Sequence, residues 1–292
     1  MDTVDAIKRK AYAKINLSLD VVGRLENGYH LVRMIMQTID LCDELIFERT
    51  SGEITIECDR KDLSVGEDNL IYKAILLMKE LYGMDGGVRV HLKKRIPMAA
   101  GMAGGSSDAA CTLKAVSDLY DLGLSEERLR QIGKKLGADV PYCVMGGTAL
   151  SEGIGEILTS IAPMPDCTLL IAKPDIDVST KYVYEQIDKK EIKDHPDVDG
   201  MKTAIERGDV REIAGLLGNV LQEVTIEKHP IVQTIKNVMT EGGALGSLMS
   251  GSGPSVFGIY ENEALAKATG EKIRELGLAD QVFVTAPVNQ NT

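Results

Sequence analysis

The chain contains 292 residues with a mass of 31.6 kDa, a length that predicts about two domains or one large one. Its composition, 44% hydrophobic and 26% charged, is that of an ordinary globular protein and excludes disordered and fibrous classes. Lys and Arg number 33 and Asp and Glu number 44, so the formal net charge is −11. This charge argues against sequence-independent binding to nucleic acid or to an anionic membrane, so an anionic ligand must be held by local groups.

Targeting segments and disulfides are not expected from this sequence. The longest apolar stretches, such as Cys167–Ala172, fall far short of the about 18 residues that cross a membrane. The first 20 residues lack the apolar segment and the cleavage site of a signal peptide. The five cysteines are scattered without a C-x-x-C pair, which predicts neither a disulfide framework nor a zinc site. We expect a cytoplasmic protein that binds a small molecule, and the sequence leaves its oligomeric state open.

The beginning of the chain predicts strands. Residues 11–21 alternate strictly between apolar and polar side chains, which is typical of a half-buried strand. Asn27-Gly28 is a strong signal for a tight hairpin turn, and an alternating run follows over 29–40. Shorter strands are expected at 44–48, 53–58 and 87–93.

Helices and a second group of strands are predicted further along. Asp68-Asn69 is a candidate cap for a helix with an apolar stripe over 70–81 that stops at Gly83. Other helices are expected at 107–120, 125–136, 231–241 and 262–276, and strands at 168–173, 244–249, 255–260 and 281–285. The pattern changes near Pro163, so we expect an α+β protein with an N-terminal domain over 1–162 and a C-terminal domain over 163–292.

A glycine-rich loop lies between a predicted strand and a predicted helix. Gly101, Gly104 and Gly105 allow backbone conformations that let main-chain N–H groups converge on an anion. The helix N-terminus that follows favours phosphate. The loop is neither a Walker A motif nor a dinucleotide fingerprint. It predicts an ATP site formed by Pro97, Met98, Ala99, Ala100, Gly101, Met102, Ala103, Gly104, Gly105, Ser106 and Ser107.

The alternative is that these small residues serve only close packing of a strand on a helix. A second glycine cluster at 250–255, between two apolar stretches, weakens that alternative, although by itself it is equally consistent with a simple turn.

Three motifs in a fixed order resemble the superfamily of galactokinase, homoserine kinase, mevalonate kinase and phosphomevalonate kinase. They are AKINL at 13–17, the loop at 97–110, and MSGSGPS at 249–255. Finer features resemble the members that phosphorylate 4-diphosphocytidyl-2-C-methyl-D-erythritol. These features are AKINL itself, NGYH at 27–30, GADVP at 137–141 and EGIGE at 152–156.

The resemblance implies a two-domain kinase fold with its active site in the cleft between the domains. It implies transfer of phosphate from ATP to the tertiary 2-hydroxyl of the methylerythritol unit. Asp139 would be the base near that hydroxyl, Lys14 its charged partner, and Asn16 would orient the polyol. Phosphoryl transfer needs this set of groups, because the protein mainly positions reactants, neutralises charge and accepts one proton. Without the motifs, Lys14 would be interpreted as a solvated strand lysine and Asp139 as a turn former.

The resemblance also implies a site for the cytidine diphosphate group of the substrate. Tyr29 and Tyr184 would stack on the two faces of the cytosine, His30 would contact its polar edge, and Thr180 would lie at the same site. Mg²⁺ is expected with ATP, with Ser107 as a candidate hydroxyl ligand. Some relatives carry a helix glutamate that binds the metal, and this chain has no clear equivalent.

Two further features bear on the loop and on other candidate sites. Position 108 is Asp where some family members have Asn, and an acid there is tolerable beside phosphate only if it points away. His91, His195 and His229 show no metal-ligand spacing and are interpreted as surface residues.

Two other functions stay open at this point. A homoserine or mevalonate-type kinase would share the loop but not the residues that face cytidine. A non-catalytic metabolite sensor would share the fold, but it has no need for the pair Lys14 and Asp139.

Overall fold

The computed structural model describes residues 6–289. Its internal contacts divide the chain into two compact units. The first unit contains Leu41–Met98, Ala103–Met145 and the described residues of Met1–Ala13. The second contains Lys14–Asp40, Ala99–Met102 and the described residues from Gly146 onward.

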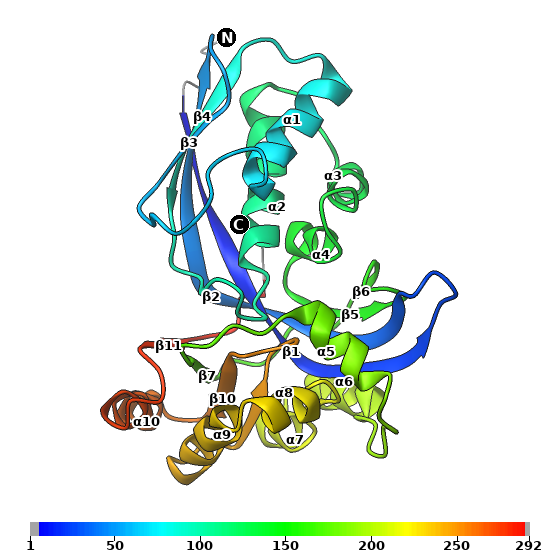
Figure 1. Cartoon of the computed structure of the whole chain (residues 1–292), viewed down its shortest axis with the longest axis vertical. Coiled ribbons are helices and arrows are strands. Elements are labelled where there is room, and N and C mark those ends of the chain that lie inside the picture. Colours follow the sequence, from blue (N-terminus) through cyan, green and yellow to red (C-terminus); the bar gives the residue numbers. More distant parts are fainter. Residues whose placement is uncertain (1–5, 290–292) are drawn as a thin grey trace. The chain divides into compact units, whose positions relative to one another are not determined.

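The first unit consists of strands with helices along one side (Figure 1). Strand β4 pairs in parallel with β3 and in antiparallel fashion with the last residues of β2, and β1 lies next to β2. The strands of this unit are β3 (Thr55–Cys58), β4 (Gly87–Lys93), the part of β1 (Ala6–Arg24) up to Ala13 and the part of β2 (His30–Thr50) from Leu41 onward. The helices are α1 (Leu70–Tyr82), α2 (Gly104–Leu119), α3 (Glu126–Gly133) and α4 (Val140–Met145).

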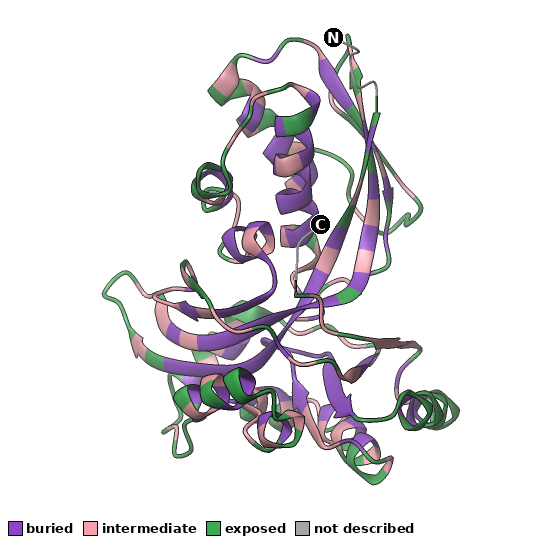
Figure 2. Ribbon diagram, turned by 180° about the vertical axis from the view of Figure 1, so that it is seen from behind, coloured by how far each residue is buried: buried purple, intermediate pink, exposed green. Residues whose placement is uncertain are grey.

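Helix α2 lies at the centre of this unit and is buried along most of its length (Figure 2). The core around it combines strand residues such as Phe47 and Val90 with helix residues such as Ile75, Leu113 and Val144, all fully buried. Small side chains on α2 let the neighbouring helices approach closely, and burial of this apolar surface is the main stabilising contribution.

The local signals of the sequence mark several helix boundaries correctly. The Asn69 side chain accepts a hydrogen bond from Ile71 N at the start of α1, and the helix ends at Gly83, which has φ 63°. Helix α2 begins at Gly104, three residues before the predicted start, because its glycines and serines already take helical conformation. Helix α3 ends at Gly133, and the residues up to Leu136 form turns.

The second unit contains an antiparallel sheet in the order β11-β7-β10-β9. These strands are β7 (Thr168–Lys173), β9 (Gly246–Met249), β10 (Val256–Tyr260) and β11 (Gln281–Thr285). Helices α9 (Ile231–Glu241) and α10 (Glu263–Glu275) pack on it (Figure 1). The predicted α+β class is therefore confirmed, and the predicted bounds of β7, β11 and α9 agree with the structure.

Other elements of the second unit were not predicted. They are β5 (Thr148–Glu152), β6 (Ile157–Ser160), β8 (Gly218–Asn219), α5 (Thr180–Ile187), α6 (Val198–Arg207), α7 (Val210–Gly215) and α8 (Gln222–Lys228). Strand β5 pairs with β2 and β6, and β8 pairs in parallel with β1. No helix in the described part of the chain is long and apolar enough to cross a membrane.

Strands β1 and β2 each continue from one unit into the other. The sequence predicts two separate strands at 29–40 and 44–48, but β2 is one strand of 21 residues. Parts of β1 and β2, together with residues 99–102, belong to the second unit. The two compact units therefore cannot be separated at a single position in the chain. The division into 1–162 and 163–292 stays a prediction.

The prediction of a half-buried strand is wrong for β1. Every residue from Ala13 to Val21 is buried, including the polar side chains of Lys14, Asn16, Ser18 and Asp20. The alternation is real, but both faces of the strand are covered by other elements. Burying polar groups is costly unless they find partners, and Asp20 finds one in His195 Nδ1, at 2.8 Å.

Candidate active site

Lys14 lies on the buried polar face of β1. The residue is 5% exposed, and its Nζ donates a hydrogen bond to Asn16 Oδ1 at 2.8 Å. Asn16 Nδ2 is in turn 3.3 Å from the sulfur of Met34. The interpretation of Lys14 as a solvated strand lysine is therefore wrong. An ammonium group in this buried setting acts on a nearby charge more strongly than one in water.

The glycine loop meets the second glycine cluster within the second unit. Lys14 N donates to Met102 O at 3.2 Å, and Ser250 Oγ donates to Gly101 O at 3.0 Å. A Cβ on Gly101 would lie 2.2 Å from Ser250 O, and Gly101 has φ 72°. Gly101 is therefore required for packing of the two loops, and the cluster at 250–255 is more than an isolated turn.

Side chains of three other elements hold the second cluster in place. Asn219 Nδ2 donates to Met249 O and to Gly251 O, both at 2.8 Å. Thr180 Oγ1, at the start of α5, lies 2.8 Å from Ser252 Oγ. The structure thus brings the predicted substrate residue Thr180 to the loop that contacts Gly101.

In the first unit, the N-terminus of α2 has no side-chain cap. Ala103 precedes it with φ 56°, whereas Asn69 and Ser125 cap the neighbouring helices α1 and α3. The first N–H groups of an α-helix lack partners within the helix, and with the positive end of the helix dipole they favour an anion. A Cβ on Gly105 would meet only Leu70 Cδ1, at 3.5 Å. Packing therefore does not explain the glycine at 105.

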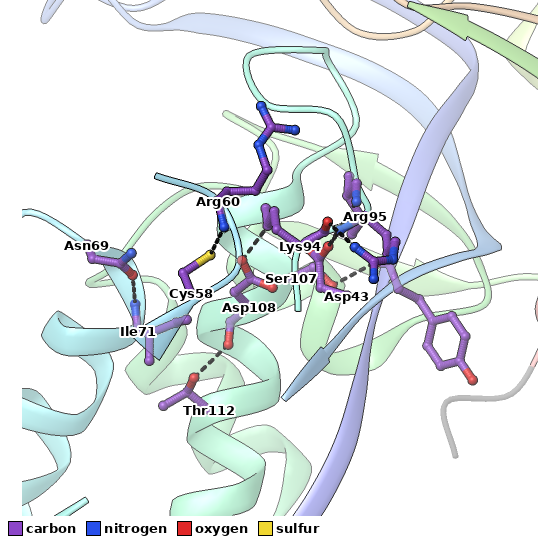
Figure 3. Close-up of polar contacts among 12 residues, drawn as sticks. Asp43, Cys58, Arg60, Asn69, Ile71, Lys94, Arg95, Ser107, Asp108 and Thr112 are labelled. Atoms are coloured by element: carbon purple, nitrogen blue, oxygen red, sulfur yellow. Dashed lines mark hydrogen bonds and ion pairs between the residues drawn. The ribbon is translucent and has the colours of Figure 1, made fainter. Parts of the chain in front are cut away.

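A buried triad of Lys94, Asp43 and Asp108 lies behind this helix start (Figure 3). Lys94 Nζ donates to Asp43 Oδ2 and, at 2.7 Å, to Asp108 Oδ2. The side chains of all three are at most 5% exposed. A Cβ on Gly104 would lie 3.2 Å from Lys94 Nζ, so the ammonium group lies directly behind the first residue of α2.

The triad joins β2, the segment after β4, and α2. Asp43 Oδ1 also accepts hydrogen bonds from the backbone N–H groups of Arg95 and Ile96, which fixes the chain just before the loop. Burial raises the pKa of Asp108 to about 8; the Lys94 ammonium opposes this rise and the Asp43 charge adds to it. Asp108 thus points toward Lys94 in the interior, the orientation that an acid at this position requires.

Ser107 and Asp139 belong to the same unit. Ser107 Oγ donates to Tyr12 O at 2.6 Å and is buried. Asp139 is partly buried in the turn before α4, as predicted. A Cβ on Gly137, in that turn, would lie 3.9 Å from Ser106 Oγ. The turn that carries Asp139 therefore lies beside the first turn of α2.

The predicted cytosine residues are partly brought together. The rings of His30 and Tyr184 have centroids 4.8 Å apart with an interplanar angle of 36°. Tyr29 is 60% exposed on the hairpin between β1 and β2. Stacking of Tyr29 and Tyr184 on opposite faces of a base stays a prediction.

Sequence reasoning missed several residues of these sites. Lys94 and Asp43 carry no motif, although Lys94 lies in a basic run directly before the loop. Asp188 lies 2.6 Å from His30 Nε2 and 3.0 Å from Arg24 Nη1, and nothing in the sequence indicates either contact. His195, interpreted as a surface residue, is half-exposed and binds the buried Asp20.

The fold and the site define a class of protein. Residues 69–147 match the family model of the GHMP kinases N terminal domain, and residues 201–278 match that of the GHMP kinases C terminal. A solved homoserine kinase from Cytophaga hutchinsonii shares the fold with a TM-score of 0.77 at 20% identity, over 100% of this chain and 98% of that chain. GHMP kinases use ATP to phosphorylate small molecules.

More similar proteins narrow the class. The 4-diphosphocytidyl-2-C-methyl-D-erythritol kinase of Lachnospira eligens is 52% identical over 283 residues, which cover 97% of this chain and 98% of that protein. A crystal structure of 4-(cytidine 5'-diphospho)-2C-methyl-D-erythritol kinase matches with a TM-score of 0.84 and 32% identity, over 97% of this chain and 100% of that one. The chain belongs to the 4-diphosphocytidyl-2-C-methyl-D-erythritol kinase family.

The different roles of Gly101 and Gly105 can be tested by measuring the stability of alanine variants. Gly101→Ala should lower the free energy of unfolding by about 1–3 kcal/mol, because the new Cβ meets a backbone oxygen and the residue must keep a positive φ. Gly105→Ala should change it by no more than about 0.5 kcal/mol. Urea unfolding of both variants measures the difference. Equal losses in the two variants would contradict the assignment of packing to Gly101 alone.

The buried Asp108 predicts a pH dependence of stability. Its pKa is about 8 in the folded chain and near 3.8 when unfolded, so between these values the folded state holds the extra proton. The free energy of unfolding must then fall as the pH rises toward 8. Asp108→Asn should remove the decrease in the free energy of unfolding that ionisation of Asp108 causes. The variant should therefore become more stable relative to the parent as the pH rises from 6 to 9.

Thermal unfolding at pH 6, 7, 8 and 9 measures that difference. Asp59→Asn is a suitable control, because its exposed carboxylate has a lowered pKa, caused first by the hydrogen bond from Lys94 N. A constant difference between Asp108→Asn and the parent across this range would show that Asp108 ionises normally.

Proposed function

We propose that this chain transfers the γ-phosphoryl group of ATP to the 2-hydroxyl of 4-diphosphocytidyl-2-C-methyl-D-erythritol, giving the 2-phosphate and ADP. The observation that carries the proposal is the arrangement of the glycine loop. Its residues 99–102 pack on the second cluster and bond to Lys14, and the helix that follows begins without a side-chain cap. The names of the relatives with nearly full-length similarity supply the substrate.

The ATP phosphates are assigned to the loop and the start of α2. The uncapped N–H groups supply hydrogen bonds, the helix dipole supplies partial positive charge, and Gly105 leaves space for the approach of an anion. We assign ATP binding to the segment Pro97–Ser107, as the resemblance implies. The triad of Lys94 keeps this segment in place from the interior, since Lys94 lies behind Gly104.

Asp139 is assigned the role of base. Transfer to an alcohol is accelerated by a carboxylate that takes the hydroxyl proton as the oxygen attacks the γ-phosphorus. The turn of Asp139 lies beside Ser106, at the start of the helix assigned to the phosphates. The family resemblance supports the same role.

Lys14 and Asn16 are assigned to the reacting groups. The buried ammonium of Lys14 would stabilise the negative charge on the transferred phosphoryl group, and Asn16, which accepts a hydrogen bond from Lys14, would orient the polyol. Lys14 belongs to the second unit and Asp139 to the first, so their pairing at one substrate rests on the family resemblance.

Mg²⁺ is proposed as the ion that accompanies ATP. In kinases Mg²⁺ bridges phosphate oxygens and often takes only one or two protein ligands. Ser107 fits such a limited role, because its hydroxyl hydrogen is donated to Tyr12 O and its lone pairs remain available. No cluster of three acidic, histidine or cysteine ligands exists among residues 6–289. The ion would neutralise phosphate charge, with Ser107 as the candidate protein ligand.

The cytidine group is assigned to His30, Tyr184, Tyr29 and Thr180. Stacking of a base on aromatic rings contributes about 1–3 kcal/mol per base. Tyr184 already packs against His30, which leaves one aromatic surface ordered for a base. Stacking does not distinguish cytosine from uracil, so hydrogen bonds at the edge of the base must do so.

An ATP-consumption assay across candidate alcohols tests the proposal. We expect the cytidine-diphosphate-linked substrate to be turned over at least about 100-fold more efficiently, as kcat/KM, than methylerythritol 4-phosphate, homoserine or mevalonate, because the base supplies binding energy that the others lack. Detection of the 2-phosphate by ³¹P NMR identifies the product.

The same panel distinguishes the other functions. Preferred turnover of homoserine or mevalonate would assign the chain to another GHMP kinase. ATP binding without turnover of any alcohol would indicate a sensor. Comparable turnover of substrates with and without a base would remove the role given to His30 and Tyr184.

Asp139→Asn tests the base. The substitution keeps the shape of the side chain but cannot accept the proton, so kcat should fall by about 10² or more while ATP affinity stays within a few-fold. Steady-state kinetics and calorimetric titration with ATP measure the two quantities. Asp85→Asn changes an exposed carboxylate of the same unit and serves as the control. If Asp139→Asn turns over as fast as this control, Asp139 is not the base.

A further inference from the structure

The imidazole of His30 is held by the carboxylate of Asp188, the C-cap residue of α5. His30 Nε2 lies 2.6 Å from Asp188 Oδ1, and the other oxygen of that carboxylate lies 3.0 Å from Arg24 Nη1. The side chain of His30 is 11% exposed. All three residues belong to the second unit. The side chain of His30 is thus largely buried, and its Nε2 is hydrogen-bonded to the Asp188 carboxylate.

Helix α5 positions this carboxylate and the neighbouring aromatic ring together. Tyr184 lies in α5, and Asp188 is the C-cap residue, which keeps helical backbone angles. The two residues are four apart and therefore lie on the same face. The Tyr184 ring packs against the His30 ring at a tilt of 36°, and Asp188 contacts Nε2 at the edge of the His30 ring. The two contacts fix the tilt of the ring and its rotation about χ2, which a single contact would leave free.

The carboxylate also decides which ring nitrogen carries the proton. An ionised carboxylate only accepts hydrogen bonds, so the neutral imidazole must carry its hydrogen on Nε2 and donate it to Asp188. Nδ1 is then a hydrogen-bond acceptor. Within the described part of the chain, Nδ1 has no hydrogen-bond partner. Nδ1 is not among the buried polar atoms that lack a partner, so it is accessible from outside the chain. An accessible acceptor on a ring whose orientation is fixed is suited to a donor on a ligand.

We propose that Asp188 is a positioning residue that selects cytosine over uracil by fixing the tautomer of His30. This inference rests on the proposed function, in which His30 faces the base. Cytosine presents an amino group at the exocyclic position, which can donate to Nδ1. Uracil presents a carbonyl oxygen there, so two acceptors would face each other once the bound base shields Nδ1 from water. Asp188 therefore determines specificity through His30 and does not contact the reacting atoms.

A purely mechanical role for Asp188 makes a different prediction. The carboxylate joins Arg24 and His30 at the base of the hairpin to α5, so it could merely keep that hairpin in place. In that case, loss of Arg24 should have the same kind of effect as loss of the carboxylate. Arg24→Gln weakens the link but leaves the Asp188–His30 hydrogen bond, which makes it the matched control.

Selectivity is measured with the cytidine-diphosphate-linked substrate and its uridine-diphosphate-linked analogue at saturating ATP. Asp188→Asn replaces an acceptor by an amide that can also donate to Nε2, so the other tautomer becomes accessible. We expect the ratio of kcat/KM for the two substrates to fall about tenfold or more, mainly through KM, with KM for ATP unchanged. Arg24→Gln should keep the ratio within about twofold. Equal losses of selectivity in both variants, or none in Asp188→Asn, would overturn the proposal.

The tautomer itself can be read without any substrate. In ¹⁵N NMR spectra of the histidine side chains, His30 should show a protonated Nε2 and an unprotonated Nδ1, and Asp188→Asn should mix the two forms. A proton on Nδ1 in the parent protein at neutral pH would overturn the proposal without any variant. If the parent does not turn over the cytidine-linked substrate, the proposed function fails, while the spectrum still decides the tautomer.

Discussion

The ammonium group of Lys94 holds three segments of the first unit at one point. It lies between the buried carboxyl groups of Asp43 and Asp108, which belong to β2 and α2. An unpaired charge in this place would cost several kcal/mol, so the three segments are stable only when assembled together. Because Lys94 lies behind Gly104, the same interaction fixes where α2 begins and where its free N–H groups point.

The polar face of β1 follows the same physical rule in the second unit. Lys14, Asn16 and Asp20 are buried, and each has a partner, including Met34 and His195. Ser18 Oγ is the exception on this face, because it is buried and has no hydrogen-bond partner among the described residues. A strand covered on both faces usually carries apolar side chains throughout. The polar row on β1 is therefore destabilising unless it is satisfied, and its retention is consistent with the role that we assign to Lys14 and Asn16.

Local features of the chain were predictable because they depend on a few neighbouring residues. Helix α1 begins after Asn69, which provides a side-chain cap, and ends at Gly83, which has a positive φ. The apolar run at 168–173 forms β7 with the predicted bounds. The predictions were wrong where the structure of a segment depends on how other elements cover it. The alternation in β1 gave the correct strand but not the cover over its polar face. Helix α4 was missed because it has only six residues, with Pro141 near its start, and is stabilised by packing.

The sequence by itself determined the order of the motifs, the glycine loop ahead of a helix, and the residue types that phosphoryl transfer requires. The tertiary structure decided which groups meet. Asp43 and Lys94 are separated by 51 residues, Gly101 and Ser250 by 149, and His30 and Asp188 by 158. Periodicity and turn propensity act over a few residues, whereas these contacts exist only when whole elements pack. The orientation of Asp108 and the tautomer of His30 therefore depend on partners that no local pattern specifies.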